Sequence, residues 1–275
     1  MFSIEIECSP EEKDLVAAEL WDAGSAGIVE TGEDRLRAFF EDEADREALA
    51  SRFHAVSWRR EEERDWVAES RANWEPALVG ERFFLVPEWR SDPAPEGRFR
   101  IVVNPGMAFG TGRHETTQLC LEALETYVRP GMHVLDVGTG TGILAQAAAL
   151  LGAAPVWACD IDPEAVEVAR GRGVPNLFVG SVEAVLPRSA GLIAANISLE
   201  AIVFLMRELL GGLGPGGVAL LSGFEAYGVP AVEAAVEQYG GKFLEARYKR
   251  DWALVAVGVK LVGGVSDADY QTPVS

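Results

Sequence analysis

The chain has 275 residues, a length that suits one large domain joined to one small domain. Its 24 basic and 43 acidic residues give a net charge of −19, which argues against binding nucleic-acid backbones, since that requires a basic face. The charge is compatible with a basic protein partner and equally with an acidic surface that serves only solubility. No apolar run is long enough to span a membrane, and residues 1–14 lack the pattern of a signal peptide. Three scattered cysteines without metal-ligand spacing fit a reducing cytoplasm.

Residues 1–62 predict a small α+β domain. The expected elements are a strand at 2–8, a helix at 9–24, a hairpin that turns at 31–34, a helix at 43–53 and a strand at 54–63. Ser9 is the expected cap of the first helix. This βαββαβ order is that of a ferredoxin-like sandwich. Residues 1–64 contain 18 acidic and 8 basic residues, so more than half of the net charge lies in this part of the chain.

Residues 63–98 predict a linker, and residues 99–260 predict a larger α/β domain. The linker begins with a helical connector and contains one apolar strand at 82–89. From about residue 115, short apolar runs alternate with helical segments, which predicts a doubly wound, mostly parallel sheet with helices on both faces. The last two strands must form an antiparallel hairpin, which is the methyltransferase variant of this α/β fold. The tail at 261–275 is predicted to be disordered.

The stretch VLDVGTGTG, residues 134–142, predicts a ligand site. Gly138, Gly140 and Gly142 lie between a strand and a helix, where glycine permits positive φ and a close backbone approach to a ligand. The spacing lacks the last glycine of the dinucleotide pattern, and Asp136 would repel a nearby phosphate. These features favour a nucleoside that carries a cationic amino-acid arm, which is S-adenosylmethionine. The alternative is a tight turn without a ligand.

Polar residues follow two further strands. Asp160 ends the next strand, where a carboxylate can accept hydrogen bonds from both ribose hydroxyls. Asp162, which precedes Pro163, is the better helix cap. Asn196 ends the fourth strand beside the topological switch point, where it would bond a substrate amine or the methionine arm of the cofactor. The alternative for Asn196 is a helix cap, a role that Ser198 would fill better.

A second glycine-rich stretch, NPGMAFGTGRHETTQLC at 104–120, precedes this loop. Together with VLDVGTGTGILA, DIDPEAVEVA, GSVEAV and AANI, it resembles the PrmA family, the methyltransferases of large-subunit ribosomal protein L-eleven. The resemblance covers most of residues 60–258 and, loosely, the amino-terminal domain. It implies an amino-terminal substrate-recognition domain, a mobile linker and a catalytic domain. It also implies methyl transfer from S-adenosylmethionine to lysine side chains and to the amino-terminal α-amine of that ribosomal protein.

The resemblance implies cofactor contacts, to which the two glycine-rich loops add others. The loop at 106–112 would close over the cofactor as a lid. The expected cofactor contacts are Phe109, Gly110, Thr111, Thr117, Asp136, Gly138, Gly140, Asp160 and Asn196. Asn196 is also the expected catalytic residue, since its amide oxygen would orient the lone pair of the acceptor amine. We further expect a cytoplasmic monomer without a metal, nucleic-acid or membrane partner.

Methyl transfer from a sulfonium is a displacement at carbon that requires a neutral amine. A free lysine with a pKa of about 10.4 is only about 0.1% neutral near pH 7.4, but desolvation and a nearby sulfonium lower that pKa. Most of the rate would come from positioning. His114 is expected to be a structural hydrogen-bonder rather than a base. The other hypotheses are a methyltransferase for another protein or a small molecule, and a nucleoside-binding module without catalysis.

Two features depart from the family pattern. Arg113 stands where the family carries His or another polar residue, and we expect its cation to face solvent, away from the sulfonium. The segment after Asp162 lacks the Asn-rich stretch that usually precedes the next strand, which affects the adenine wall and not the fold.

Overall fold

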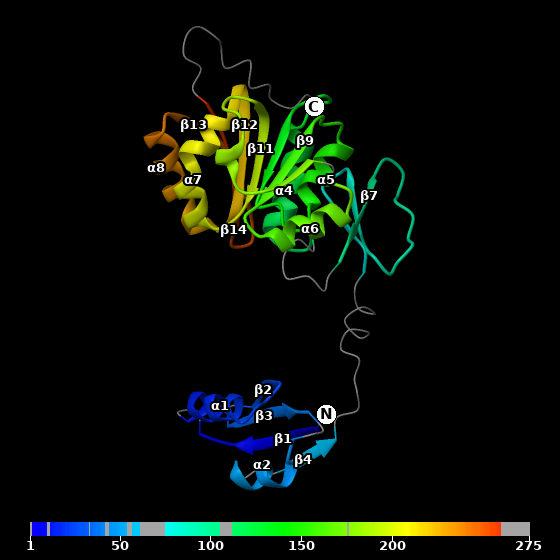
Figure 1. The fold of residues 1–275 in the computed structure, drawn as a ribbon, viewed down its shortest axis with the longest axis vertical. Helices are drawn as coiled ribbons and strands as arrows, with labels where there is room; N and C mark the ends of the chain where they lie inside the picture. The colour runs from blue at the N-terminus through cyan, green and yellow to red at the C-terminus, as the bar shows by residue number, and fades with distance from the viewer. Residues whose placement is uncertain are drawn as a thin grey trace. The chain divides into compact units, whose positions relative to one another are not determined.

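The computed structural model of the chain describes residues 2–9, 12–32, 34–41, 44–53, 57–60, 75–104, 112–174 and 176–259. Its contacts divide the chain into two compact units, Met1–Asn73 and Trp74–Ser275, which Figure 1 shows as ribbons. Each unit has a hydrophobic core of its own. A separate core is what allows a unit to fold as a domain.

The first unit is an antiparallel sheet with two helices. Its elements are β1 (Phe2–Glu7), α1 (Lys13–Asp22), β2 (Gly27–Gly32), β3 (Arg35–Phe40), α2 (Arg46–Arg52) and β4 (Ser57–Arg60). The strand order is β2-β3-β1-β4, with every neighbouring pair antiparallel. Alternate residues of β1, Phe2, Ile4 and Ile6, enter the core beside Leu20 of α1. This topology is the ferredoxin-like arrangement that the sequence predicts.

The start of α1 differs from the prediction. Ser9 does not cap the helix, because α1 begins at Lys13 and the residue before it, Glu12, makes no side-chain cap bond. Ser9 Oγ instead donates to Glu12 Oε2 at 2.6 Å. The helix thus begins three residues later than a Ser9 cap would place it.

The second unit contains a seven-stranded sheet with helices on both faces. Its strands are β8 (Val134–Val137), β9 (Val156–Asp160), β10 (Asn176–Val179), β11 (Ala190–Asn196), β12 (Leu213–Glu225), β13 (Gly241–Lys249) and β14 (Trp252–Val259). The order is β10-β9-β8-β11-β12-β14-β13. β8 to β12 run parallel, and β14 is antiparallel to both of its neighbours. The predicted doubly wound sheet that ends in an antiparallel hairpin is confirmed.

Two groups of helices cover the two faces of this sheet. The helices are α4 (Glu115–Tyr127), α5 (Ile143–Leu150), α6 (Pro163–Gly171), α7 (Leu199–Gly212) and α8 (Val229–Gln238). The first three contribute to one core and the last two to the other. Neighbouring residues of β8 enter opposite cores, Val134 the first and Leu135 the second, because successive side chains of a strand point to opposite faces.

A three-stranded sheet precedes α4. It consists of β5 (Ala77–Val79), β6 (Phe83–Pro87) and β7 (Phe99–Val103), with β5 antiparallel and β7 parallel to β6. Buried residues on all three strands join the core that α4 and α5 also line. Residues 75–98 were predicted as part of the linker at 63–98, and in the structure they belong to the second unit. The helical connector predicted at the start of that linker lies outside the described residues.

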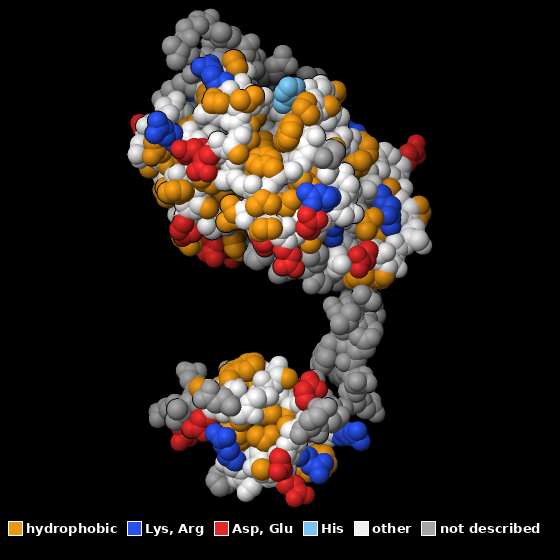
Figure 2. Space-filling model, viewed as in Figure 1, with side chains coloured by type: hydrophobic (Ala, Val, Ile, Leu, Met, Phe, Trp, Pro, Cys, Tyr) orange, Lys and Arg blue, Asp and Glu red, His pale blue; other side chains and the backbone are white. Residues whose placement is uncertain are grey.

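The connection from β10 to β11 contains only a short 3₁₀ helix, Val182–Ala184, where a longer crossover helix would cover the sheet. A cavity of about 660 Å³ opens beside it, lined by Leu135, Trp157, Phe178 and neighbouring residues. Figure 2 shows hydrophobic side chains exposed on one face of this unit. His133 and Pro155, which precede β8 and β9, also line the cavity, so it lies at the amino ends of these parallel strands. The glycine-rich loop follows the opposite ends.

Candidate functional site

Three of the predicted site residues meet at the carboxyl edge of the parallel strands. β8 lies between β9 and β11 in the sheet, and the register places Val137 opposite both Cys159 and Ala195. The residues that follow these three, Gly138, Asp160 and Asn196, therefore lie side by side. Ligands of doubly wound α/β folds bind in the crevice at this edge.

The glycine-rich loop has two packed glycines and one open glycine. Gly138, Gly140 and Gly142 all have positive φ, at 69°, 52° and 79°. A Cβ at Gly138 would lie 2.3 Å from Ile197 Cγ2, and one at Gly142 would lie 2.8 Å from Val174 Cγ2. A Cβ at Gly140 would have no atom within 4 Å. The loop backbone at Gly140 is thus the part that a ligand can approach closely.

Asp136, near the end of β8, holds this loop by hydrogen bonds. It is buried, and its Oδ2 accepts from Thr139 Oγ1 at 2.7 Å and from the backbone N of Ala145 at 3.1 Å. Its Oδ1 has no hydrogen-bond partner among the described residues. Burial raises the pKa of Asp136 to about 6, although the two hydrogen bonds lower it. The carboxylate links strand, loop and first helical turn; a direct contact with the cofactor stays a prediction.

The raised pKa predicts a pH-dependent stability difference for Asp136→Asn. The folded protein binds the Asp136 proton more tightly than the unfolded chain, so this proton stabilises the fold fully below about pH 4, and the stabilisation is lost as the pH rises through about 6. The asparagine retains an acceptor for Thr139 and Ala145 and carries no charge. The variant should be more stable than the wild type by up to about 3 kcal/mol at neutral pH and no more stable near pH 4. Urea unfolding of both proteins between pH 4 and 8 measures the difference; a constant difference would contradict the account.

Asp160 fits a ribose. Its Oδ2 accepts from the backbone N of Gly140 at 2.9 Å, and its Oδ1 accepts from the backbone N of Asp162 at 3.1 Å. Each carboxylate oxygen retains a second acceptor position, so both ribose hydroxyls can donate to this carboxylate. Asp162 caps α6 by accepting from the backbone N of Glu164 at 2.9 Å, with Pro163 in the first turn. The division of roles between these two aspartates as ligand and cap agrees with this geometry.

Asn196 does not cap the helix that follows it. Ser198 fills that position, because its Oγ accepts from the backbone N of Ala201 at 3.3 Å. Asn196 Nδ2 donates instead to Thr117 Oγ1 at 3.4 Å, across 79 residues of sequence. Thr117 is buried in the first turns of α4. The structure thus brings Thr117 and Asn196 together beside Gly138, and the Asn196 amide oxygen is not used in this bond.

Gly223 is a residue of the site region that the sequence interpretation missed. It lies at a register shift in β12, between Ser222 and Phe224, and has a φ of 102°. A Cβ there would lie 2.2 Å from the carbonyl oxygen of Ile197, the residue after Asn196. Only glycine permits this approach of β12 to the end of β11. A glycine inside the apolar run LLSGF was the available signal.

His114 has a structural role at the start of α4. Its Nδ1 accepts from the backbone N of Thr116 at 3.3 Å and so caps the helix. Its ring meets Trp252 of β14 edge-on, with the ring centroids 4.4 Å apart. Arg113, just before it, is exposed, and its Nη2 donates to the backbone carbonyl of Glu75 at 2.7 Å.

Other predicted or conceivable site features need only brief mention. Phe109, Gly110 and Thr111 lie outside the described residues. Within the described ranges, no group of three or more His, Cys, Asp or Glu side chains could hold a metal ion, and no helix is long and apolar enough to cross a membrane. Burial raises the pKa of the Cys120 and Cys159 thiols, so neither supplies a thiolate nucleophile at neutral pH.

The strand order, the glycine loop after β8 and the acidic residue that ends β9 together define a class I methyltransferase, which takes its methyl group from S-adenosylmethionine. The family model of the ribosomal protein L11 methyltransferases (PrmA) matches residues 42–260, and the chain belongs to this family.

Individual relatives agree with this assignment. A ribosomal protein L11 methyltransferase of Deinococcus radiodurans is 34% identical over 253 residues, which cover 86% of this chain and 91% of the relative. The one from Pelotomaculum thermopropionicum is 41% identical over 213 residues, or 75% of this chain and 69% of the relative. A crystal structure of the ribosomal protein L11 methylase from Lactobacillus delbrueckii subsp. bulgaricus superposes with a TM-score of 0.62 at 30% identity. The match covers 68% of this chain and 99% of the Lactobacillus chain.

Proposed function

We propose that this enzyme methylates amines of ribosomal protein L11, on lysine side chains, on the amino-terminal α-amine or on both. The observation that carries the proposal is the placement of Asn196, which Ser198 frees from capping and which bonds Thr117 at 3.4 Å beside the glycine loop. A neutral amide at this point presents an oxygen to an amine without adding a charge. The family to which the chain belongs is named for methylation of this substrate.

The residues of the chain divide the work between holding the cofactor and orienting the acceptor. When bound, S-adenosylmethionine supplies an already activated methyl group on a sulfonium. The Asp160 carboxylate would accept hydrogen bonds from the ribose hydroxyls, and the open backbone at Gly140 would allow the nucleoside to approach closely. Thr117 accepts a hydrogen bond from the Asn196 amide, whose oxygen would accept an N–H of the amine and so orient the lone pair on nitrogen for attack. The amine gives up a proton to solvent before attack, since only its neutral form is nucleophilic.

We propose substrate recognition for the first unit and methyl transfer for the second. The acidic excess of residues 1–64 suits a basic protein target, because complementary charge accelerates encounter. A separate small domain also serves a protein substrate better than a small molecule. We further propose that the enzyme acts as a cytoplasmic monomer and makes no contact with nucleic acid.

Mass spectrometry of the ribosomal protein after incubation with the enzyme and S-adenosylmethionine tests the function. We expect the mass to rise in steps of one CH₂, and digestion should locate the added groups on lysines or at the amino terminus. Reactions without cofactor are the control for methyl groups already present. An unchanged mass, with the cofactor bound to the enzyme, would contradict the proposal and would favour another protein or a small molecule as acceptor.

A further inference from the structure

The chain enters the second unit along α4 and is fixed near both ends of that helix. At one end, Arg113 Nη2 donates to the carbonyl oxygen of Glu75. At the other end, the Glu125 carboxylate accepts from the backbone N of Glu81 at 3.0 Å and of Arg82 at 2.8 Å. The segment from Glu75 to Arg82, which contains β5, is therefore hydrogen-bonded near both ends of α4.

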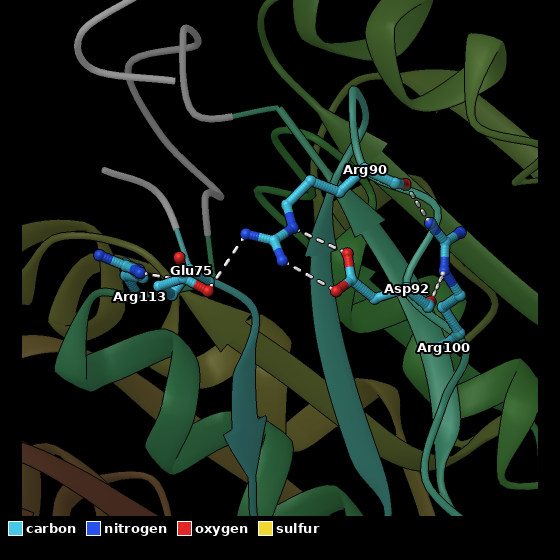
Figure 3. A network of polar contacts seen from close by, with 5 residues as sticks. All are labelled: Glu75, Arg90, Asp92, Arg100 and Arg113. Atoms are coloured by element: carbon cyan, nitrogen blue, oxygen red, sulfur yellow. Dashed lines mark hydrogen bonds and ion pairs between the residues drawn. The ribbon is translucent and has the colours of Figure 1, made fainter. Parts of the chain in front are cut away.

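The entry point, Glu75, is held by its side chain as well as by its backbone. Its carboxylate pairs with Arg90 Nη1 at 3.1 Å, and Arg90 makes two bonds to Asp92, at 2.7 and 2.9 Å. Arg100 in turn donates to the carbonyl oxygens of Asp92 and Arg90. Figure 3 shows Arg113 and Arg90 converging on Glu75 from two sides. This network, Glu75, Arg90, Asp92, Arg100 and Arg113, is called the entry clamp below.

Arg113 connects the entry clamp to the start of α4, the helix that carries Thr117 of the proposed methyl-transfer site. Arg113 follows Gly112, where a Cβ would lie 2.4 Å from Leu85 Cδ1 and 3.1 Å from Ile143 Cδ1, so the backbone is tightly enclosed there. The carbonyl oxygen of Arg113 accepts from Gln118 Nε2 at 2.8 Å. Thr117, which bonds Asn196, lies one helical turn beyond Arg113. A single arginine thus joins the chain entry to the helix end that carries Thr117.

We propose that Arg113 is a positioning residue for the protein acceptor, and that it acts by holding the chain entry at the cofactor end of α4. This inference rests on the proposed function. An acceptor bound to the first unit is tethered to the second unit by the chain that enters it at Glu75, and the effective concentration of a tethered group depends on where and how firmly the tether is fixed. Arg113 is exposed and its bond to the Glu75 carbonyl is a single hydrogen bond at the surface, so its loss should change delivery of the acceptor more than folding.

Steady-state kinetics of full-length Arg113→Ala with the ribosomal protein test the proposal. We expect the KM for that protein to rise about three- to tenfold, with kcat and the cofactor Kd each within about twofold of the wild type. Arg113→Lys, which retains a donor for the Glu75 carbonyl, should recover part of the loss. The matched control is Arg129→Ala, because Arg129 also donates to backbone carbonyls, those of Thr126 and Val128, at the far end of α4. It should leave all three constants unchanged.

The possible outcomes separate this inference from the proposed function. A fall in kcat or a weaker cofactor Kd with an unchanged KM would overturn it, because Arg113 would then shape the methyl-transfer site itself. Three unchanged constants in Arg113→Ala would also overturn it. A wild-type enzyme that never methylates the ribosomal protein would contradict the proposed function instead.

Discussion

Replacing Asn196 with alanine should lower kcat for the ribosomal protein about 10²-fold, while the Kd of the cofactor should rise by less than about tenfold. The side chain lies at the end of β11, and its amide nitrogen donates to Thr117, so the amide oxygen has a fixed direction in which we propose that it meets the acceptor amine. The sulfonium needs no further activation, so the rate depends on how the lone pair of the amine is aimed at the methyl group. Without the amide the lone pair would no longer be oriented, while Asp160 and the glycine loop would still bind the nucleoside.

Two further variants show whether the effect of Asn196 is specific. Asn176 donates its amide to the carbonyl oxygen of Val156 at 2.9 Å, at the amino end of β10. Asn176→Ala is therefore a control that loses an asparagine of the same sheet far from the methyl-transfer edge, and its kcat should be unchanged. Thr117→Val removes the hydroxyl that accepts from Asn196 and should lower kcat about tenfold. If Asn196→Ala lost turnover and cofactor affinity equally, Asn196 would be only a cofactor ligand.

Local patterns in the sequence predicted the parts of the site that depend on neighbouring residues. The spacing of Gly138, Gly140 and Gly142 identified the loop because positive φ is a property of the glycines themselves. Pro163 distinguished Asp162 as a cap from Asp160 because its ring fits the first turn of a helix. The alternation of strands and helices then placed these residues at one edge of the sheet.

Features that depend on contacts between distant segments could not be read in the same way. Asp136 is buried and bonds Thr139 and Ala145, a role within the loop that the sequence did not reveal, while its contact with the cofactor stays a prediction. The strand at β5 has only three residues, too few for a periodic signal. Arg113 bonds a carbonyl 38 residues away, so its identity alone did not reveal its partner. Its expected exposure was correct, while the role that we now propose for it required the contact with Glu75.

Replacing Gly223 with alanine should destabilise the second unit by about 3–5 kcal/mol and abolish most methyl transfer. The new Cβ would lie 2.2 Å from the carbonyl oxygen of Ile197 and 2.8 Å from the carbonyl carbon and the nitrogen of the same residue. These are backbone atoms of the segment that positions Asn196, and the Ile197 nitrogen also donates to the carbonyl oxygen of Ser222 at 3.0 Å. Relief of the overlap must therefore move the end of β11 away from β12.

A second glycine of β12 separates this overlap from backbone strain. Gly216 also has a positive φ, 71°, but a Cβ there would have no atom within 4 Å. Gly216→Ala should therefore cost only the conformational strain, about 1–2 kcal/mol, and retain activity. Urea unfolding and initial methylation rates of both variants measure the two effects. Equal losses of stability would show that strain alone requires glycine at position 223. A larger loss in Gly223→Ala, together with lost turnover, would show that the end of β11 has no room to move without displacing Asn196 from the acceptor.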